Sequence, residues 1–324
     1  MRVVYLGTPA AAVPPLRALL ASAHEVVAVV TRPDRPRDRR GGSPQPSPVK
    51  QAAQEAGLPV LEPPGGRDPE LPGRLAALGA DIGVSCAFGY LLPDPVLAAF
   101  PRGIINLHFS LLPAYRGAAP VQRALLDGAA VTGVTTFVID AGMDTGPMLL
   151  AAEVPVHDGE DAGALTARLA EVGARLVVET LDALEAGQLQ PRPQPEEGAS
   201  LAPKVSGEET RLDFTWPAGR LADAVRAFTP APGAWTTHRG RRLKITRAVP
   251  TGGGDRGAGD QGPGPPRSGP EPGRIAVDPD GRLLVGAGDG SLELLEVRPE
   301  GRRAMSGAEF ARGARLGPDE RLGQ

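Results

Sequence analysis

Short apolar runs alternate with segments of helical periodicity through the first half of the chain, and no other feature of the sequence constrains the fold as strongly. Strand-like runs occur at residues 3–6, 26–31, 59–61, 82–85, 103–107, 132–139 and 148–154. Apolar residues recur at helical spacing between them, as in Val13, Leu16 and Leu19. Strands that alternate with helices form a mainly parallel sheet with right-handed crossovers. The sequence therefore predicts an N-terminal α/β domain.

A proline-rich stretch divides the chain. Pro191, Pro193 and Pro195 stand at alternate positions, which favours an extended, semi-rigid linker. After it come one helix-like segment at 221–228 and short strand-like runs at 235–248, 274–277, 283–285 and 292–297, a pattern typical of a small β-barrel. We predict a first domain at 1–188, a linker at 189–203 and a smaller β-barrel domain at 204–324. A disordered Gly- and Pro-rich insertion is expected at 252–273.

Composition excludes several classes of protein. The single cysteine, Cys86, rules out an internal disulfide and a Cys-rich zinc site, and its apolar neighbours predict a buried, inert thiol. The acidic and imidazole residues lack the spacing of metal ligands, so we expect no metal. Residues 1–6 lack a signal-peptide pattern, and prolines and charges interrupt the apolar segment at 10–30. We therefore expect a cytoplasmic protein without a membrane span, and a monomer.

Two polar side chains mark the end of the strand-like run at 103–107. Asn106 and His108 alternate along the strand and so point the same way, at the carboxyl edge of the sheet where α/β proteins bind ligands. Asp144 lies in a second, glycine-flanked loop. An Asn amide can hold a developing oxyanion, a His can pass a proton, and a carboxylate can orient that His. Together they suit transfer of an activated one-carbon acyl group to an amine, although each alone also fits a structural role.

The string around these residues is Asn-x-His-x-Ser-Leu-Leu-Pro, followed by Arg-Gly and Asp-Thr-Gly. It resembles the signature of the 10-formyltetrahydrofolate-dependent formyltransferases. The resemblance covers most of the chain, through LGTP at 6–9, TRPDRP at 31–36, PSPVK at 46–50, RGAAPVQ at 116–122 and RAFTPAPGAW at 226–235. It implies a Rossmann-like catalytic domain followed by an OB-like β-barrel domain. The implied reaction moves a formyl group from 10-formyltetrahydrofolate to the free amine of initiator methionyl-tRNA.

The same resemblance assigns roles to individual residues. It implies that Asn106, His108 and Asp144 are catalytic. It also implies a folate-contacting loop made of Ser110, Leu111, Leu112 and Pro113. Phe109 departs from the pattern, which has a small residue or proline there, and Ala10 and Ala11 replace an acidic–aromatic pair. Because successive strand residues face opposite sides, we predict that the Phe109 ring points away from the folate.

The net charge of −3 means that a polyanionic partner must be held by local basic patches. The predicted tRNA-binding residues lie in a loop, with Arg35, Arg37, Arg39 and Arg40, and in a hairpin, with Arg239, Arg241, Arg242 and Lys244. Either patch also fits ordinary solvated surface. Two other functions stay open: a related formyltransferase acting on a sugar-nucleotide amine or on glycinamide ribonucleotide, and a non-catalytic RNA-binding module.

Overall fold

The computed structural model describes residues 1–36, 44–251, 270–317 and 319–324, which form two compact units. The first comprises Met1–Pro120, Val131–Pro155 and Thr166–Pro203. The second comprises Val121–Ala130, Val156–Leu165 and Lys204–Gln324, so it takes in two short pieces from within the predicted first domain. Most of the predicted insertion at 252–273 lies outside the described residues.

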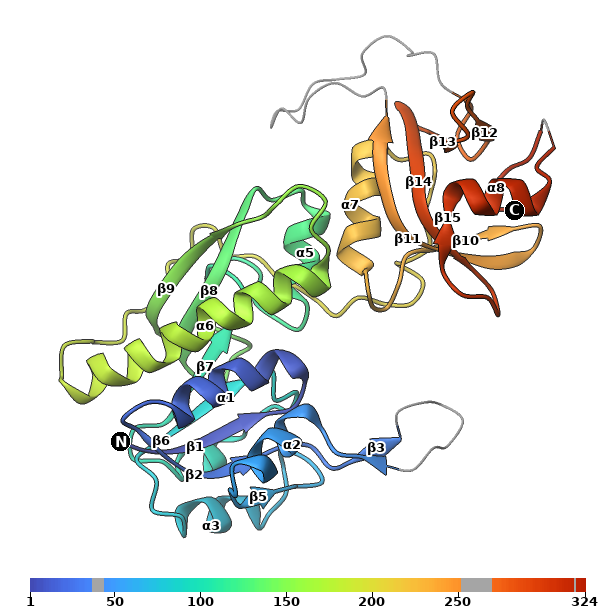
Figure 1. Ribbon diagram of the computed structural model, residues 1–324. Helices are drawn as coiled ribbons and strands as arrows, with labels where there is room; N and C mark the ends of the chain where they lie inside the picture. The colour runs from blue at the N-terminus through green and yellow to red at the C-terminus, as the bar shows by residue number, and fades with distance from the viewer. Residues whose placement is uncertain (37–43, 252–269, 318) are drawn as a thin grey trace. The chain divides into compact units, whose positions relative to one another are not determined.

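A seven-stranded sheet forms the centre of the first unit (Figure 1). Its order is β5-β2-β1-β6-β7-β8-β9, and these strands span Val60–Leu61, Glu25–Val30, Arg2–Gly7, Ile82–Cys86, Ile104–His108, Val131–Val138 and Met148–Pro155. The first five run parallel; β8 runs antiparallel to β7, and β9 runs antiparallel to β8. Buried β-branched residues such as Val4, Val29 and Val84 fill the central strands, as expected where helices cover both faces. The predicted α/β fold with a mainly parallel sheet is confirmed.

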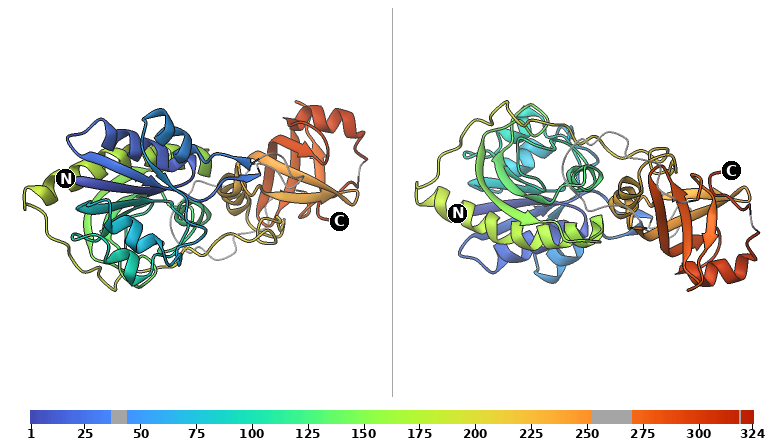
Figure 2. Two further views of the ribbon diagram at one scale, coloured as in Figure 1. Left: turned by 90° about the horizontal axis from the view of Figure 1, so that it is seen from below. Right: turned by 90° about the horizontal axis from the view of Figure 1, so that it is seen from above.

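Helices lie on both faces of this sheet (Figure 2). They are α1 (Val13–Leu20), α2 (Pro48–Glu55), α3 (Leu71–Ala76), α4 (Asp94–Leu97) and α6 (Ala162–Glu185), and a 3-10 turn at Ala10–Ala12 precedes α1. Ser47 caps α2: its hydroxyl accepts a hydrogen bond from the Lys50 N–H at 3.0 Å, and Pro48 is the first helical residue. None of the helices in the described ranges is long and apolar enough to cross a membrane.

A hydrophobic cluster joins α3, α4 and the segments beside them to the central strands. Its members include Val4, Leu6, Val30, Leu71, Leu75, Phe88, Val96, Phe100 and Ile104. A large apolar side chain contributes about 1.5–3 kcal/mol when it is fully buried, so the cluster stabilises the packing of these helices on the sheet. Cys86, the last residue of β6, is buried as predicted, and burial raises the pKa of its thiol to about 12.

A curled antiparallel sheet forms the second unit. Its order is β10-β11-β14-β13-β12, over Trp235–His238, Arg241–Thr251, Gly290–Pro299, Leu283–Ala287 and Ile275–Val277, and β15 (Met305–Ser306) pairs with β14. The helix α7 (Ala218–Phe228) packs on β11 and β14. The predicted OB-like fold is confirmed as a half-barrel. The prediction of a single helix missed α8 (Gly307–Ala314), which begins with a capping box between Ser306 and Glu309.

Candidate active site

A cavity of about 670 Å³ opens at the carboxyl end of β7. Asn106 and His108 line it from that strand, and Asp144 lines it from the loop between β8 and β9. Because β8 runs antiparallel to β7, it ends beside Ile105, and its loop must fold back along β7 to reach His108. The structure thus brings together the three residues that the sequence singled out.

His108 is buried at the end of β7, with 5% of its surface exposed. Its Nε2 lies 2.9 Å from the carbonyl oxygen of Tyr115, and its Nδ1 lies 3.7 Å from Asp144 Oδ2. A carbonyl oxygen only accepts hydrogen bonds, so Nε2 carries the proton and Nδ1 of the neutral ring presents a lone pair. Burial lowers the pKa of His108, while the Asp144 carboxylate and the bond to Tyr115 raise it. The ring is therefore neutral at neutral pH, beside a carboxylate that favours its protonated form.

The backbone of Asp144 adopts φ +53°, in the left-handed region that residues other than glycine rarely occupy. Its Oδ2 accepts a hydrogen bond from the Gly117 N–H at 2.8 Å. Within the same loop, the Asp140 carboxylate accepts from the Thr145 hydroxyl at 2.8 Å. These contacts fix the Asp144 carboxylate on the side of the cavity where His108 lies.

Asn106 is half-buried, and its side-chain amide has no hydrogen-bond partner in the described part of the chain. Its N–H groups are therefore available to a ligand in the cavity. An amide donor beside a neutral imidazole can stabilise an oxyanion and accept a proton in one step. Across residues 1–36, 44–251, 270–317 and 319–324, no cluster of three or more His, Cys, Asp or Glu side chains is arranged to hold a metal ion.

The predicted folate-contacting residues Ser110, Leu111, Leu112 and Pro113 form a turn bonded to β8. The buried Ser110 hydroxyl donates to the Ala114 carbonyl at 2.6 Å. The Thr135 hydroxyl donates to the Ser110 carbonyl at 2.8 Å and accepts from the Leu112 N–H at 3.1 Å. None of these four described residues lines the cavity. The turn supports the end of β7, and its contact with the folate stays a prediction.

Phe109 does line the cavity, beside Asn106 and His108. Leu107, which alternates with Asn106 and His108 along β7, belongs to the same lining, so the lining does not decide where the Phe109 ring points. The prediction that the ring points away from the folate stays a prediction. Its premise is weakened because β7 ends at His108 and a bend begins at Phe109, where the alternation of side chains along a strand no longer applies.

Most of the cavity wall comes from residues that the sequence analysis did not single out. The segment after β6 supplies Phe88, Tyr90, Leu91 and Leu92, and the loop after β8 supplies Ile139 and Met143. Leu91 is 78% exposed and Met143 is 58% exposed, so both offer apolar surface to a ligand. The available signal was position, because the segment directly follows the carboxyl end of a parallel strand.

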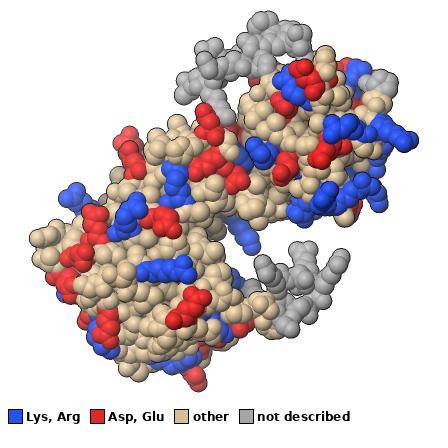
Figure 3. Space-filling model, viewed as in Figure 1, with Lys and Arg blue, Asp and Glu red and all other residues tan. Residues whose placement is uncertain are grey.

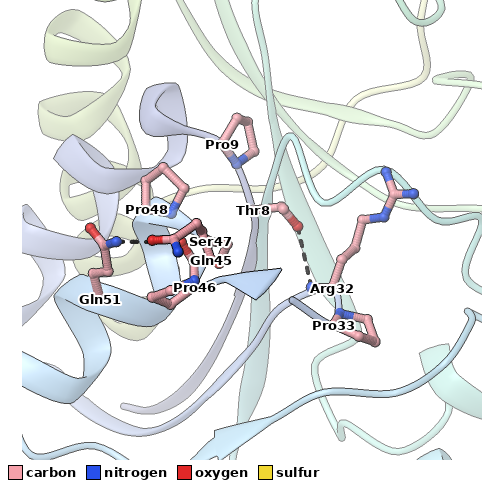
Figure 4. A pocket seen from close by; sticks show the side chains of 9 residues that line it. All are labelled: Thr8, Pro9, Arg32, Pro33, Gln45, Pro46, Ser47, Pro48 and Gln51. Carbon is pink, nitrogen blue, oxygen red and sulfur yellow. Dashed lines mark hydrogen bonds between the residues drawn. The ribbon is translucent and has the colours of Figure 1, made fainter. Parts of the chain in front are cut away.

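A second cavity, of about 500 Å³, opens at the carboxyl ends of β1 and β2 (Figure 4). Thr8 and Arg32 line it from these strand ends, and Ser47 lines it from the start of α2. The Thr8 hydroxyl accepts from the Arg32 N–H at 3.4 Å, and the Arg32 guanidinium lies 5.0 Å from the centre of the Tyr90 ring. Because Tyr90 also lines the first cavity, this positive charge stands beside both.

The first predicted basic patch lies largely outside the described residues. This is so for Arg37, Arg39 and Arg40. Arg35 belongs to the short strand β3 (Arg35–Pro36), which pairs with β4 (Pro44–Gln45), and its side chain is also outside the description. The contacts predicted between this loop and tRNA stay a prediction.

The second basic patch is well defined. Lys and Arg side chains gather on the part of the second unit around α8, β10 and β15 (Figure 3). Arg241 and Arg242 are exposed, and the Arg242 guanidinium lies 4.3 Å from the centre of the Trp235 ring, an arrangement that leaves its N–H donors available. Burial, together with the positive charges of Arg298 and Arg242, lowers the pKa of Lys244. The positive charges of Arg298 and Arg242 beside Lys244 favour an anionic ligand here.

Arg239 differs from its neighbours in this patch. Its guanidinium forms two bonds with the Glu320 carboxylate, Nε to Oε1 at 2.7 Å and Nη2 to Oε2 at 2.9 Å. His238 Nε2 lies 3.0 Å from the same Oε1. Bonding to Arg239 lowers the pKa of Glu320 to about 2. The charge of Arg239 is therefore already compensated within the protein.

Two family descriptions match the chain. The formyl transferase family matches residues 1–181, and the formyl transferase C-terminal domain matches residues 204–315. A methionyl-tRNA formyltransferase from Frankia casuarinae is 49% identical over 326 residues, covering 100% of this chain and 96% of that protein. The chain belongs to the methionyl-tRNA formyltransferase family. The family expected from the sequence motifs is thus confirmed.

Solved structures extend this comparison beyond the family. Glycinamide ribonucleotide transformylase 1 from Symbiobacterium toebii is 28% identical, with a TM-score of 0.51, over 60% of this chain and 93% of that one. HypX from Aquifex aeolicus, solved in complex with tetrahydrofolic acid, shares the fold, with 18% identity and a TM-score of 0.63 over 96% of this chain and 47% of that one. Formyl transferases use a formylated tetrahydrofolate as the donor.

Proposed function

We propose that this protein transfers the formyl group of 10-formyltetrahydrofolate to the free amino group of initiator methionyl-tRNA, which gives N-formylmethionyl-tRNA for translation initiation. The observation that carries the proposal is the 49% identity to a methionyl-tRNA formyltransferase, which extends over the whole chain. The likeness to a glycinamide ribonucleotide transformylase covers only 60% of the chain and leaves a large part without a counterpart. Glycinamide ribonucleotide is therefore the weaker candidate for the acceptor. Two solved sugar N-formyltransferases cover 94% and 90% of this chain, but they share only 16% and 18% identity with it, against 49% for the methionyl-tRNA enzyme.

We assign the folate to the cavity at the end of β7. Its volume of about 670 Å³ suits a small ligand, since such sites span about 300–1,000 Å³. Phe88 and Leu92 provide an apolar wall for a flat ring, and Asn106 and His108 provide a polar end. The bound folate supplies the activated formyl group. We keep the turn formed by residues 110–113 as a candidate for contact with the folate, and it also supports His108.

The three polar residues act together at this polar end. The Asn106 amide donates to the oxygen that becomes negative as the amine nitrogen attacks the formyl carbon. Nδ1 of His108 takes the proton that the amine releases, and Asp144 Oδ2, 3.7 Å away, stabilises the resulting imidazolium. The bond from Nε2 to the Tyr115 carbonyl keeps the ring in this orientation. The positive ring also stabilises the oxyanion and holds a proton for the leaving nitrogen.

The tRNA is held by cationic side chains. On the second unit we assign this role to the exposed Arg241 and Arg242 and to the half-buried Lys244. We add the exposed Arg298, which the sequence analysis did not single out. Arg239 contributes less because Glu320 already compensates its charge. In the first unit the loop residues Arg35, Arg37, Arg39 and Arg40 are assigned to the acceptor end of the tRNA. Phosphate contacts of this kind give affinity without sequence specificity.

A formylation assay with 10-formyltetrahydrofolate and three acceptors tests the proposal. The acceptors are charged initiator tRNA, glycinamide ribonucleotide and an amino-sugar nucleotide. We expect formyl transfer to the charged tRNA with a far higher kcat/KM than to either small amine. Preference for a small amine would overturn the proposed acceptor. Transfer to none of the three, with tRNA binding intact, would favour a non-catalytic RNA-binding module.

A further inference from the structure

The segment at 192–202, within the stretch predicted to be a linker, is bonded to the first unit beside the candidate site. Arg192 and Met148 exchange backbone hydrogen bonds, each of 2.8 Å. Further along, the Arg116 N–H donates to the Ser200 carbonyl at 2.8 Å, and the Ala202 N–H donates to the Arg116 carbonyl at 2.6 Å. A passive spacer has no need of such paired contacts. The segment is therefore part of the framework around the cavity.

One side chain of this segment reaches the Asp144 loop. The Gln194 Nε2 donates to the carbonyl oxygens of Asp144 and Gly146, both at 2.8 Å. Its Oε1 accepts from Arg116 Nε at 2.9 Å and from Arg116 Nη2 at 2.7 Å. Carbonyl oxygens only accept and a guanidinium only donates, so this is the one orientation of the amide that satisfies all four bonds. Gln194 thus joins the Asp144 loop to Arg116 through a single amide.

The loop that is held in this way needs support. Asp144 occupies the left-handed region at φ +53°, which persists in a residue other than glycine only where the surroundings fix it. Its carboxylate is bonded to the N–H of Gly117, the neighbour of Arg116. Gln194 is therefore connected to both partners of the Asp144–Gly117 hydrogen bond. It bonds to the Asp144 loop directly and to Gly117 through the neighbouring Arg116.

The same segment also holds the other partner of His108. The Ser200 hydroxyl accepts from the Tyr115 N–H at 2.9 Å, and the Tyr115 carbonyl accepts from His108 Nε2. Both groups that flank the imidazole, Asp144 and the Tyr115 carbonyl, are thus tied to residues between 194 and 200. A shift of this segment would change the surroundings of both ring nitrogens.

We propose that Gln194 is a positioning residue, which sets the separation between Asp144 and His108 and makes the segment at 192–202 part of the reaction site. The inference rests on the proposed function for its kinetic consequences only. If Gln194 loses its two donor bonds, the Asp144 loop relaxes away from His108. The carboxylate then stabilises the imidazolium less, because charge interactions weaken with distance.

Two variants test this, and a third is the control. Gln194→Glu keeps the acceptor for Arg116 but replaces the donor by an oxygen that faces two carbonyls. Gln194→Met removes donor and acceptor without adding charge, and serves if the Glu variant folds poorly. Gln190→Glu makes the same chemical change at an exposed position two residues before the segment. All three are compared with the wild-type protein by thermal unfolding, to verify that they fold.

The first readout is the titration of His108 by NMR in the protein without substrate. The chain has four histidines, so the signal is assigned with the variant His108→Gln. We expect His108 to titrate at lower pH in Gln194→Met than in the wild type, and unchanged in Gln190→Glu. Gln194→Glu adds a carboxylate near the ring, which acts in the opposite direction, so this variant is used for the rate measurement only. An unchanged His108 titration in folded Gln194→Met would overturn the inference. This measurement does not depend on whether the proposed function is correct.

The second readout is formyl transfer to charged tRNA. Displacement of a catalytic group by about 1 Å costs up to about 100-fold in rate, so kcat should fall about 10- to 100-fold in the Gln194 variants, with KM for folate and tRNA within about threefold of wild type. A merely structural role would instead lower stability without a selective loss of kcat, and that result would count against positioning. If the wild type formylates nothing, the proposed function fails while the titration still decides the role of Gln194.

Discussion

Replacing Arg241 and Arg242 together by Ala should flatten the salt dependence of tRNA binding, whereas replacing Arg239 should not. Arg241 and Arg242 are exposed, and the only ring or acid contact described for Arg242 is its stacking on Trp235. Arg239 is also exposed, but two hydrogen bonds join its guanidinium to the Glu320 carboxylate. A cation that is already paired with a carboxylate neutralises a phosphate poorly and so releases few of the counterions bound to the nucleic acid. The three arginines thus form a matched set within one hairpin.

The expected magnitude follows from counterion release. Each phosphate contact contributes about −0.9 to the slope of log affinity against log salt on a duplex. Loss of two contacts should reduce the magnitude of the slope by about 1.8. Over a fourfold rise in salt concentration, the tRNA affinity of the wild type should therefore fall about 12-fold more than that of the double variant. Filter binding of uncharged initiator tRNA at several salt concentrations measures this slope directly. Arg239→Ala should leave the slope nearly unchanged.

Thermal unfolding separates the two kinds of arginine further. Arg239→Ala should lower the melting temperature, because it leaves Glu320 without its main partner. The pKa of Glu320 is depressed in the folded state to about 2, so its contribution to stability is present above the unfolded value of 4.5 and is lost as pH falls toward 2. The destabilisation should therefore shrink in acid. A slope as flat in Arg239→Ala as in the double variant would refute the assignment of compensated and available charge.

Three further predictions concern the first unit. His108→Ala and Asp144→Asn should each lower kcat for formyl transfer by about 10²–10⁴-fold, the usual cost of losing general acid–base help, with the melting temperature and folate affinity retained; near-wild-type turnover would remove the residue from the mechanism. In the pH profile of kcat/KM, the inflection due to His108 should lie below the usual histidine pKa of 6.5, because burial lowers the pKa of His108. Asp144→Asn should move this inflection to still lower pH, because the carboxylate raises the His108 pKa. A shift to higher pH would contradict this electrostatic account. Cys86, with a pKa of about 12, should resist a thiol reagent at pH 8 in the folded protein and react at once in denaturant, whereas fast labelling of the folded protein would show that the end of β6 is accessible.

Much of the fold was predictable because its signals are local. The apolar runs and helical spacings predicted the strands of the first unit. The pair Ser47-Pro48 is another local signal, since the Ser47 hydroxyl caps α2 and Pro48 begins it. The capping box Ser306–Glu309 was an equally local signal that the prediction passed over, so α8 was missed. Phe109 shows the limit of periodicity, because the strand ends one residue earlier.

What the sequence by itself determined were the family, the two-part fold and the pair Asn106 and His108, because a two-residue repeat along one strand fixes which side chains share a face. Only the tertiary structure decided that Asp144 reaches His108, since β8 runs antiparallel and its loop has to fold back. It also decided that Gln194 braces that loop and that Glu320 neutralises Arg239. Such contacts join residues far apart in the chain, and no local repeat encodes them. They depend on how the strands and the segment at 192–202 pack.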